Sequence, residues 1–136
     1  MEAGDASRQM LTVARRFGDS LHAVPMSGVE PYAPDALAAL VADAADELNA
    51  AAILAAGTER GNEVMARVAA RVGLPLAANC VAATPGNPVS VTRQRWGGSL
   101  LEEARLHSAR PLITVAPHTV AIGDGPAPIE VDLQPF

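Results

Sequence analysis

The residues Ala50–Ala56 read AAAILAA, and residues 57–62, which read GTERGN, follow them directly. A continuous apolar run of this length that ends in a turn is typical of a strand buried on both faces of a parallel sheet. The next segment, Gly61–Val72, carries apolar residues at helical spacing with charged residues between them, and Gly73 ends it. A buried strand that leads at once into an amphipathic helix is a building unit of layered α/β folds.

The N-terminal segments continue this alternation. Ser7–Phe17 and Asp35–Leu48 have apolar residues at three- and four-residue steps, which predicts two amphipathic helices. Between them, Leu21–Met26 is a short strand candidate that Pro25 weakens. The first half therefore reads helix, strand, helix, strand, helix. This order predicts an α/β fold of three layers, with a mostly parallel sheet flanked by helices.

The second half has more strand candidates than helix candidates. They are Leu76–Ala83, Val89 to Trp96, Leu100–His107, Leu112–Ala116 and, as an edge or tail strand, Ile129–Leu133. Residues 85–88 (PGNP) supply a turn between the first two segments, and Gly97-Gly98 can turn a hairpin between the next two. Leu100–His107 also has good helix propensity, but we interpret it as a strand. The sheet is thus expected to carry an antiparallel hairpin extension.

Composition narrows the class of protein. The 136 residues are 49% hydrophobic and 18% charged, which fits a single domain over residues 1–136. A net charge of −5 argues against a nucleic-acid partner, because phosphate binding needs clustered Lys or Arg. No apolar stretch reaches the ~20 residues of a membrane-spanning helix, so no membrane insertion is expected. The single Cys80 excludes an internal disulfide and favours a reducing, cytoplasmic compartment.

The junction between the buried strand and its helix is one candidate binding site. It lies at the carboxyl end of a parallel strand, where open α/β sheets place ligands, and free amides at a helix start attract anions. Thr58, Gly61 and Asn62 are therefore candidates for binding a nucleotide phosphate. The alternative is a structural cap, in which Thr58 or Asn62 satisfies the amides and Gly61 permits the turn. The junction has neither the P-loop spacing nor G-x-G-x-x-G.

A second candidate site is the cluster Arg93, Arg95 and Trp96, which precedes the glycine turn. Arginine and tryptophan are enriched at protein interfaces, so the cluster predicts an interface; an exposed edge strand with snorkelling arginines is the alternative. No catalytic constellation accompanies these clusters. The three histidines have no nucleophile-elbow partner, no Cys/His spacing matches a zinc site, and adjacent Glu102 and Glu103 would face opposite ways on a strand. A catalyst is therefore less expected than a binding or scaffold protein.

Three motifs resemble the electron-transfer flavoprotein α subunit. Ile53–Ala70 is similar to that family's strand, T-x-x-G turn and helix ending in R-V-A-A; residues 91–99 (VTRQRWGGS) resemble its R-x-x-Y-[AG]-G-N hairpin; residues 111–115 (PLITV) resemble its V-I-T-[IV]-R strand. The matching positions are Thr58, Gly61, Arg67, Val68, Ala69, Ala70, Arg93, Gly97 and Gly98. The departures are Asn62 for Lys, Ala66 for Pro, Trp96 for Tyr, Ser99 for Asn, Ala116 for Arg, and Asn79-Cys80 for Ser-Asp.

The resemblance implies a fold, cofactors and partners. The fold is the adenine nucleotide α-hydrolase-like arrangement, and the motifs between Leu37 and Val120 cover the N-terminal domain, not the C-terminal domain that holds FAD in the family. The implied partner is a β-like subunit that binds AMP, with dehydrogenases as indirect partners. We expect a scaffold role in electron transfer through FAD, and keep as the alternative a stand-alone adenine-nucleotide-binding module. The family's first strand is also mostly missing, so an exposed sheet edge and a homodimer are further expectations.

Overall fold

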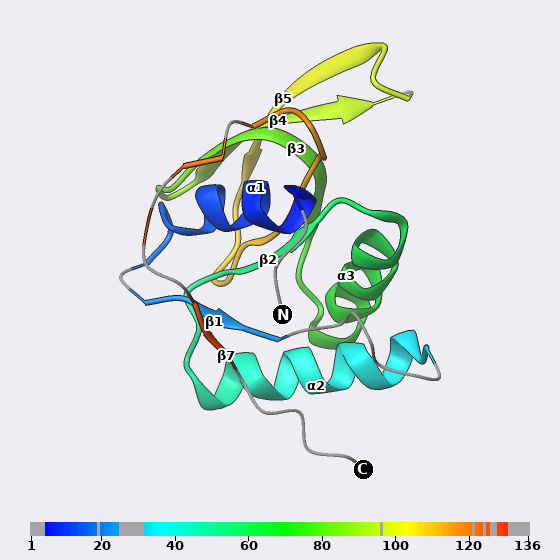
Figure 1. Ribbon diagram of the computed structural model, residues 1–136, viewed down its shortest axis with the longest axis vertical. Helices are drawn as coiled ribbons and strands as arrows, with labels where there is room; N and C mark the ends of the chain where they lie inside the picture. Colours follow the sequence, from blue (N-terminus) through cyan, green and yellow to red (C-terminus); the bar gives the residue numbers. More distant parts are fainter. Residues whose placement is uncertain are drawn as a thin grey trace.

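The computed structural model describes residues 5–18, 20–24, 32–95, 97–120, 122–123, 125 and 128–130. Its elements follow the chain in the order α1, β1, α2, β2, α3, β3, β4, β5, β6, β7 (Figure 1). Among these residues no helix is long and apolar enough to cross a membrane.

Three helices form where the apolar spacing predicts them. They are α1 (Asp5–Ala14), α2 (Pro34–Glu47) and α3 (Glu59–Val72). α1 ends before the predicted Phe17, because the next residues tighten into turns with bonds from Arg16 N to Val13 O and from Phe17 N to Ala14 O. α2 begins with Pro34, whose missing N–H costs nothing at a helix start. α3 ends at Gly73, whose φ of 70° gives the left-handed cap.

Among the described residues the main sheet has five strands in the order β2-β6-β3-β4-β5. The strands are β2 (Ile53–Ala56), β6 (Leu112–Val115), β3 (Leu76–Thr84), β4 (Val89–Arg95) and β5 (Leu100–Leu106). β2 and β3 each pair with β6 in parallel, whereas β3-β4 and β4-β5 are antiparallel. The expected α/β fold with an antiparallel extension is confirmed, and the sheet is mixed: β3 belongs to both of its halves.

Two short strands pair outside this sheet. β1 (His22–Ala23) and β7 (Ile129–Glu130) form a parallel two-stranded sheet, with His22 opposite Ile129. Both lie inside segments predicted as strands, and the remaining residues of those two predictions that fall on 25–26 and 131–133 lie outside the described part.

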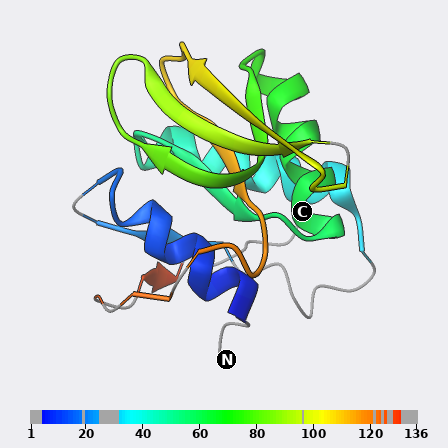
Figure 2. The same ribbon diagram turned by 90° about the horizontal axis from the view of Figure 1, so that it is seen from above.

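The helices cover the sheet from both sides and give three layers (Figure 2). Val13 of α1 packs in a buried cluster with residues of β3, β4, β5 and β6, including Cys80, Val91 and Ile113. Leu37 of α2 and Val68 of α3 belong to a second cluster on the other face. Because β6 lies between the two clusters, all four of its residues are buried. This burial explains why its segment is a continuous apolar run apart from a threonine.

The return strand of the hairpin settles the helix-or-strand choice for residues 100–107. β5 pairs with β4 along its whole length, with Arg93 opposite Glu102 and Thr92 opposite Glu103. The strand interpretation is therefore confirmed, and the two adjacent glutamates do lie on opposite faces. Long-range pairing outweighs the local helix propensity here, which is a weak preference.

Candidate functional site

The site begins at the turn from β2 into α3, on the carboxyl side of the parallel strands. Thr58 is the N-cap of α3, with an extended backbone, and its Oγ1 accepts a hydrogen bond of 3.1 Å from Gly61 N. One of the otherwise unsatisfied amides of the helix start is thereby paired. The capping interpretation of this turn is therefore confirmed for Thr58. Its role with a phosphate stays a prediction.

The two glycines of this turn are required by close backbone approaches. A Cβ on Gly57 would lie 2.8 Å from the carbonyl oxygen of Val115, because Gly57 N donates to that oxygen at 2.7 Å. A Cβ on Gly61 would collide with the carbonyl oxygen of Ala56. The T-x-x-G spacing thus fixes how closely α3 approaches the end of β2.

Asn62, the third predicted phosphate residue, is engaged with the protein itself. Its Nδ2 donates to Gly57 O at 3.3 Å and to Asn79 Oδ1 at 3.1 Å, while its Oδ1 accepts from Thr114 Oγ1 at 2.7 Å. Thr114, which is 0% exposed, also accepts from Asn79 N at 2.8 Å. These residues form an amide–hydroxyl network that joins α3, β3 and β6. Every polar side-chain atom of Asn62 has a partner in it.

Sequence reasoning did not identify Asn79 and Thr114. Each is a polar residue inside an apolar strand segment, and that interruption is the signal that could have found them, because buried polar groups require partners. Asn79 also has a φ of 59°, a left-handed conformation that asparagine tolerates better than most residues. The strand register shifts around it, between Ala77 and Cys80 against β6. β3 therefore bulges beside the network.

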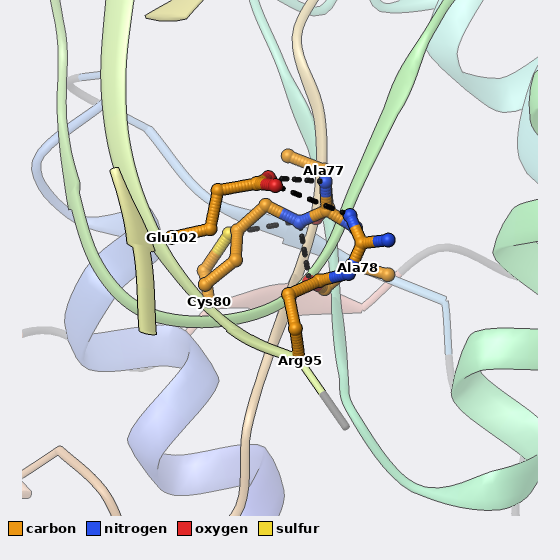
Figure 3. A network of polar contacts seen from close by, with 6 residues as sticks. Ala77, Ala78, Cys80, Arg95 and Glu102 are labelled. Atoms are coloured by element: carbon orange, nitrogen blue, oxygen red, sulfur yellow. Dashed lines mark hydrogen bonds and ion pairs between the residues drawn. The ribbon is translucent and has the colours of Figure 1, made fainter. Parts of the chain in front are cut away.

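Arg93 holds this bulge from the neighbouring strand. Its Nε donates to Ala78 O at 2.9 Å and its guanidinium contacts Glu102 at 3.2 Å. Glu102 also contacts Arg95 at 3.3 Å, so one carboxylate bridges two arginines (Figure 3). The side chain of Arg93 is 21% exposed and that of Arg95 is 46% exposed. The side chain of Arg93 therefore mainly stabilises the fold, whereas the side chain of Arg95 is partly accessible to solvent.

Cys80 follows the bulge and is buried. Its Sγ donates to Ala77 O at 3.5 Å (Figure 3). Burial raises the pKa of this thiol to about 11, an effect that the nearby positive charge of Arg93 partly offsets. The thiol is therefore protonated near neutral pH and acts as a small buried hydrophobe more than as a nucleophile.

A cavity connects parts of both predicted clusters. It measures about 500 Å³ and is lined by residues from the ends of β2 and β6, from the β3 bulge and from the hairpin: Gly57, Asn79, Arg93, Gln94, Arg95, Gly97, Gly98, Ala116 and Pro117. Thr58, Gly61 and Asn62 are not among these lining residues. Trp96, the third predicted interface residue, lies outside the described residues.

The charges around this cavity favour an anionic ligand, and the binding of one stays a prediction. Two guanidinium groups and one bridging carboxylate leave an excess of positive charge, and Arg95 provides donors on the exposed side. Within the described ranges no three His, Cys, Asp or Glu residues gather as metal ligands. The histidines at 22, 107 and 118 are exposed.

FAD, which the sequence resemblance implies, does not fit this lining. Aromatic ring systems are held mainly by hydrophobic and aromatic side chains, and among the described residues of the cavity wall only Ala116 and Pro117 are apolar. The other wall residues are glycines or polar side chains. No electron-transfer step is therefore assigned to the described residues of this chain.

Comparison with known proteins agrees with the fold. A search of curated protein sequences finds no match for this chain. A family model described as electron transfer flavoprotein domain matches residues 3–132, a range that contains both candidate clusters and all strands of the main sheet. Because this match spans nearly the whole sequence, the chain belongs to the electron transfer flavoprotein domain family.

Proposed function

We propose that this chain is an α-subunit-like scaffold, on which a β-like partner subunit and a flavin-bearing chain assemble for electron transfer from dehydrogenases. The proposal rests on one observation: the residues of the family motifs stabilise the fold of this chain. Thr58 caps α3, Gly61 lets α3 approach β2, and Arg93 holds the β3 bulge. Motif residues that stabilise the fold are more consistent with a role in assembly than with a role in a reaction. The family match supports the electron-transfer context.

The tip of the β4–β5 hairpin is the surface that we assign to the partner. Arg95 is the half-exposed member of the arginine pair, and Gly97 and Gly98 beside it are exposed. We include Trp96 in the proposed surface because it directly follows Arg95 in the sequence. An arginine next to a tryptophan is the kind of anchor that carries binding energy at interfaces.

Reconstitution tests the assembly. The chain is co-expressed with a β-like subunit and a flavin-bearing chain, and the complex is analysed by size-exclusion chromatography with detection of flavin absorbance. We expect co-elution of all chains with flavin, and weaker assembly for Arg95→Glu. Arg71→Glu is the matched control, because Arg71 is also exposed but lies on α3. Formation of neither a complex nor a flavin-containing species contradicts the proposal.

A second candidate function is a nucleotide-binding module. It is favoured by the cavity at the carboxyl ends of β2 and β6, whose wall includes Arg95 and Gly57, the residue before the N-cap of α3. Calorimetry of the chain alone with AMP and with ATP tests this function. Binding that Arg95→Gln weakens supports it, whereas no heat at millimolar nucleotide removes it and leaves the scaffold role untouched. In both cases we place the protein in the cytoplasm; as a scaffold it is part of an electron carrier, whereas as a nucleotide-binding module it has no electron-transfer activity.

A further inference from the structure

The strand β5 has one edge that no described residue pairs with. It is the last strand in the sheet order, and its only pairing there is with β4. In Figure 1 the β4–β5 hairpin projects from the body of the protein, away from α2. The strand contains neither proline nor glycine, and Leu100 and Leu101 are 55% and 66% exposed. Edge strands with unpaired backbone groups are templates for pairing with another chain, and the charged residues of β5, Glu102, Glu103 and Arg105, limit which chain can pair there.

Two charged residues of β5, Glu103 and Arg105, determine which chain can pair with this edge. Glu103 and Arg105 are two residues apart, so their side chains lie on the same face of the sheet, and both are exposed. Glu102, on the opposite face, is already paired with Arg93 and Arg95. In the described part of the chain, neither Glu103 nor Arg105 has an ion pair. A glutamate and an arginine that flank one alanine form a self-complementary pattern.

The pattern selects one register for antiparallel pairing of two copies. If a two-fold axis perpendicular to the sheet passes at Ala104, each Glu103 lies opposite the Arg105 of the other copy, so two ion pairs form at once. Moving the axis to Glu103 places two glutamates opposite each other, and moving it to Arg105 places two arginines opposite each other. Like charges directly opposite are destabilising, so these registers are disfavoured.

We propose that the outer edge of β5 is a homodimer interface, at which β5 pairs antiparallel with β5 of a second copy about Ala104. The two five-stranded sheets then form one continuous sheet. The occupant of the edge is a second copy because the charge pattern complements itself. This inference does not depend on the proposed function, since it concerns the chain alone and a surface that lies outside the cavity.

Charge reversal tests the interface in sedimentation equilibrium of the full chain. We expect a monomer–dimer equilibrium for the unaltered protein. Glu103→Arg and Arg105→Glu each place like charges opposite in both pairs, and each is expected to raise the dissociation constant about tenfold. The double variant E103R/R105E restores both pairs with reversed polarity and is expected to recover dimerisation. Glu47→Arg, at an exposed position on α2, is the matched control.

Cross-linking tests the register independently. In the Ala104→Cys variant the introduced thiols face each other across the axis, so oxidation is expected to give an intermolecular disulfide. Leu101→Cys, whose partner position is His107, is expected not to form one. A monomer at every concentration overturns the proposal. So does a dimer that is insensitive to both single reversals or cross-links through position 101. Circular dichroism establishes that each variant is folded.

Discussion

Replacing Asn62 by aspartate preserves the shape of the side chain and removes its two N–H donors. In the unaltered protein those donors bind Gly57 O and Asn79 Oδ1, and Thr114 Oγ1 donates to the remaining oxygen. The introduced carboxylate keeps the contact with Thr114 but presents an oxygen to two acceptors. Each lost bond that leaves a partly buried group without a donor costs about 1–2 kcal/mol, so we expect N62D to lower the free energy of unfolding by about 3 kcal/mol at pH 7.

The same geometry gives the pH dependence. Nearby acceptors disfavour ionisation of the introduced carboxyl, so its pKa in the folded protein is raised above its unfolded value. The protonated form, which can donate one bond, therefore stabilises the folded state at low pH, and this contribution is lost as pH rises through the raised pKa. The difference between N62D and the unaltered protein is thus expected to widen with rising pH.

Urea unfolding over a pH series measures both effects. Asn87→Asp is the control, because Asn87 is exposed in the turn between β3 and β4. A double-mutant cycle of Asn62→Ala with Thr114→Val, in which each single change removes the hydrogen bond between the two side chains, measures their coupling. A loss below about 0.5 kcal/mol for N62D, or a cycle that is fully additive, would refute the network as a stabilising unit.

Three further predictions concern the same region. Gly61→Ala is expected to cost about 2 kcal/mol or more, visible in thermal unfolding, because its Cβ would meet the carbonyl oxygen of Ala56, which is backbone. The pKa of Cys80 is raised from 9.0 to about 11, so the free energy of unfolding is expected to fall as pH rises from about 9 to about 11, and Cys80→Ala is expected to remove this loss. Iodoacetamide is expected to label the thiol of the folded chain far more slowly than that of the unfolded chain. Arg93→Lys is expected to destabilise by about 1–2 kcal/mol in urea, because an ammonium cannot reach Ala78 O and Glu102 with the same fork; an unchanged midpoint would contradict this role.

Local patterns predict the elements well and their ends less well. The helix predicted from Gly61 begins at Glu59, because a capped turn includes the charged residues that precede the apolar stripe. The strand predicted from Ala50 begins at Ile53 instead. Asn49 takes a φ of 50° and Ala50 N bonds to Ala45 O, so the end of α2 uses the first residues of the apolar run. Hydrophobicity alone does not distinguish a helix cap from a strand start.

The candidate site was predicted only in part, for a different reason. The turn chemistry of Thr58 and Gly61 is local and can be read from spacing. The bonds of Asn62 to Asn79 and Thr114 span 17 and 52 positions of the chain, and they depend on a bulge that shifts the register. The same holds for Arg93, whose partner Ala78 lies on the neighbouring strand. No periodicity in a single segment contains this information.

The place of β3 in the sheet has a consequence for how the domain opens. β3 gives one edge to β6 in parallel and the other edge to β4 in antiparallel pairing, and Ala116 N also bonds to Cys80 O. A fluctuation that releases β3 therefore separates the β2–β6 pair from the hairpin and opens the first core cluster, to which β3, β4, β5 and β6 all contribute. The two halves are bound into a single cooperative unit, so amide protons of β6 and β4 should become exchangeable in the same opening event.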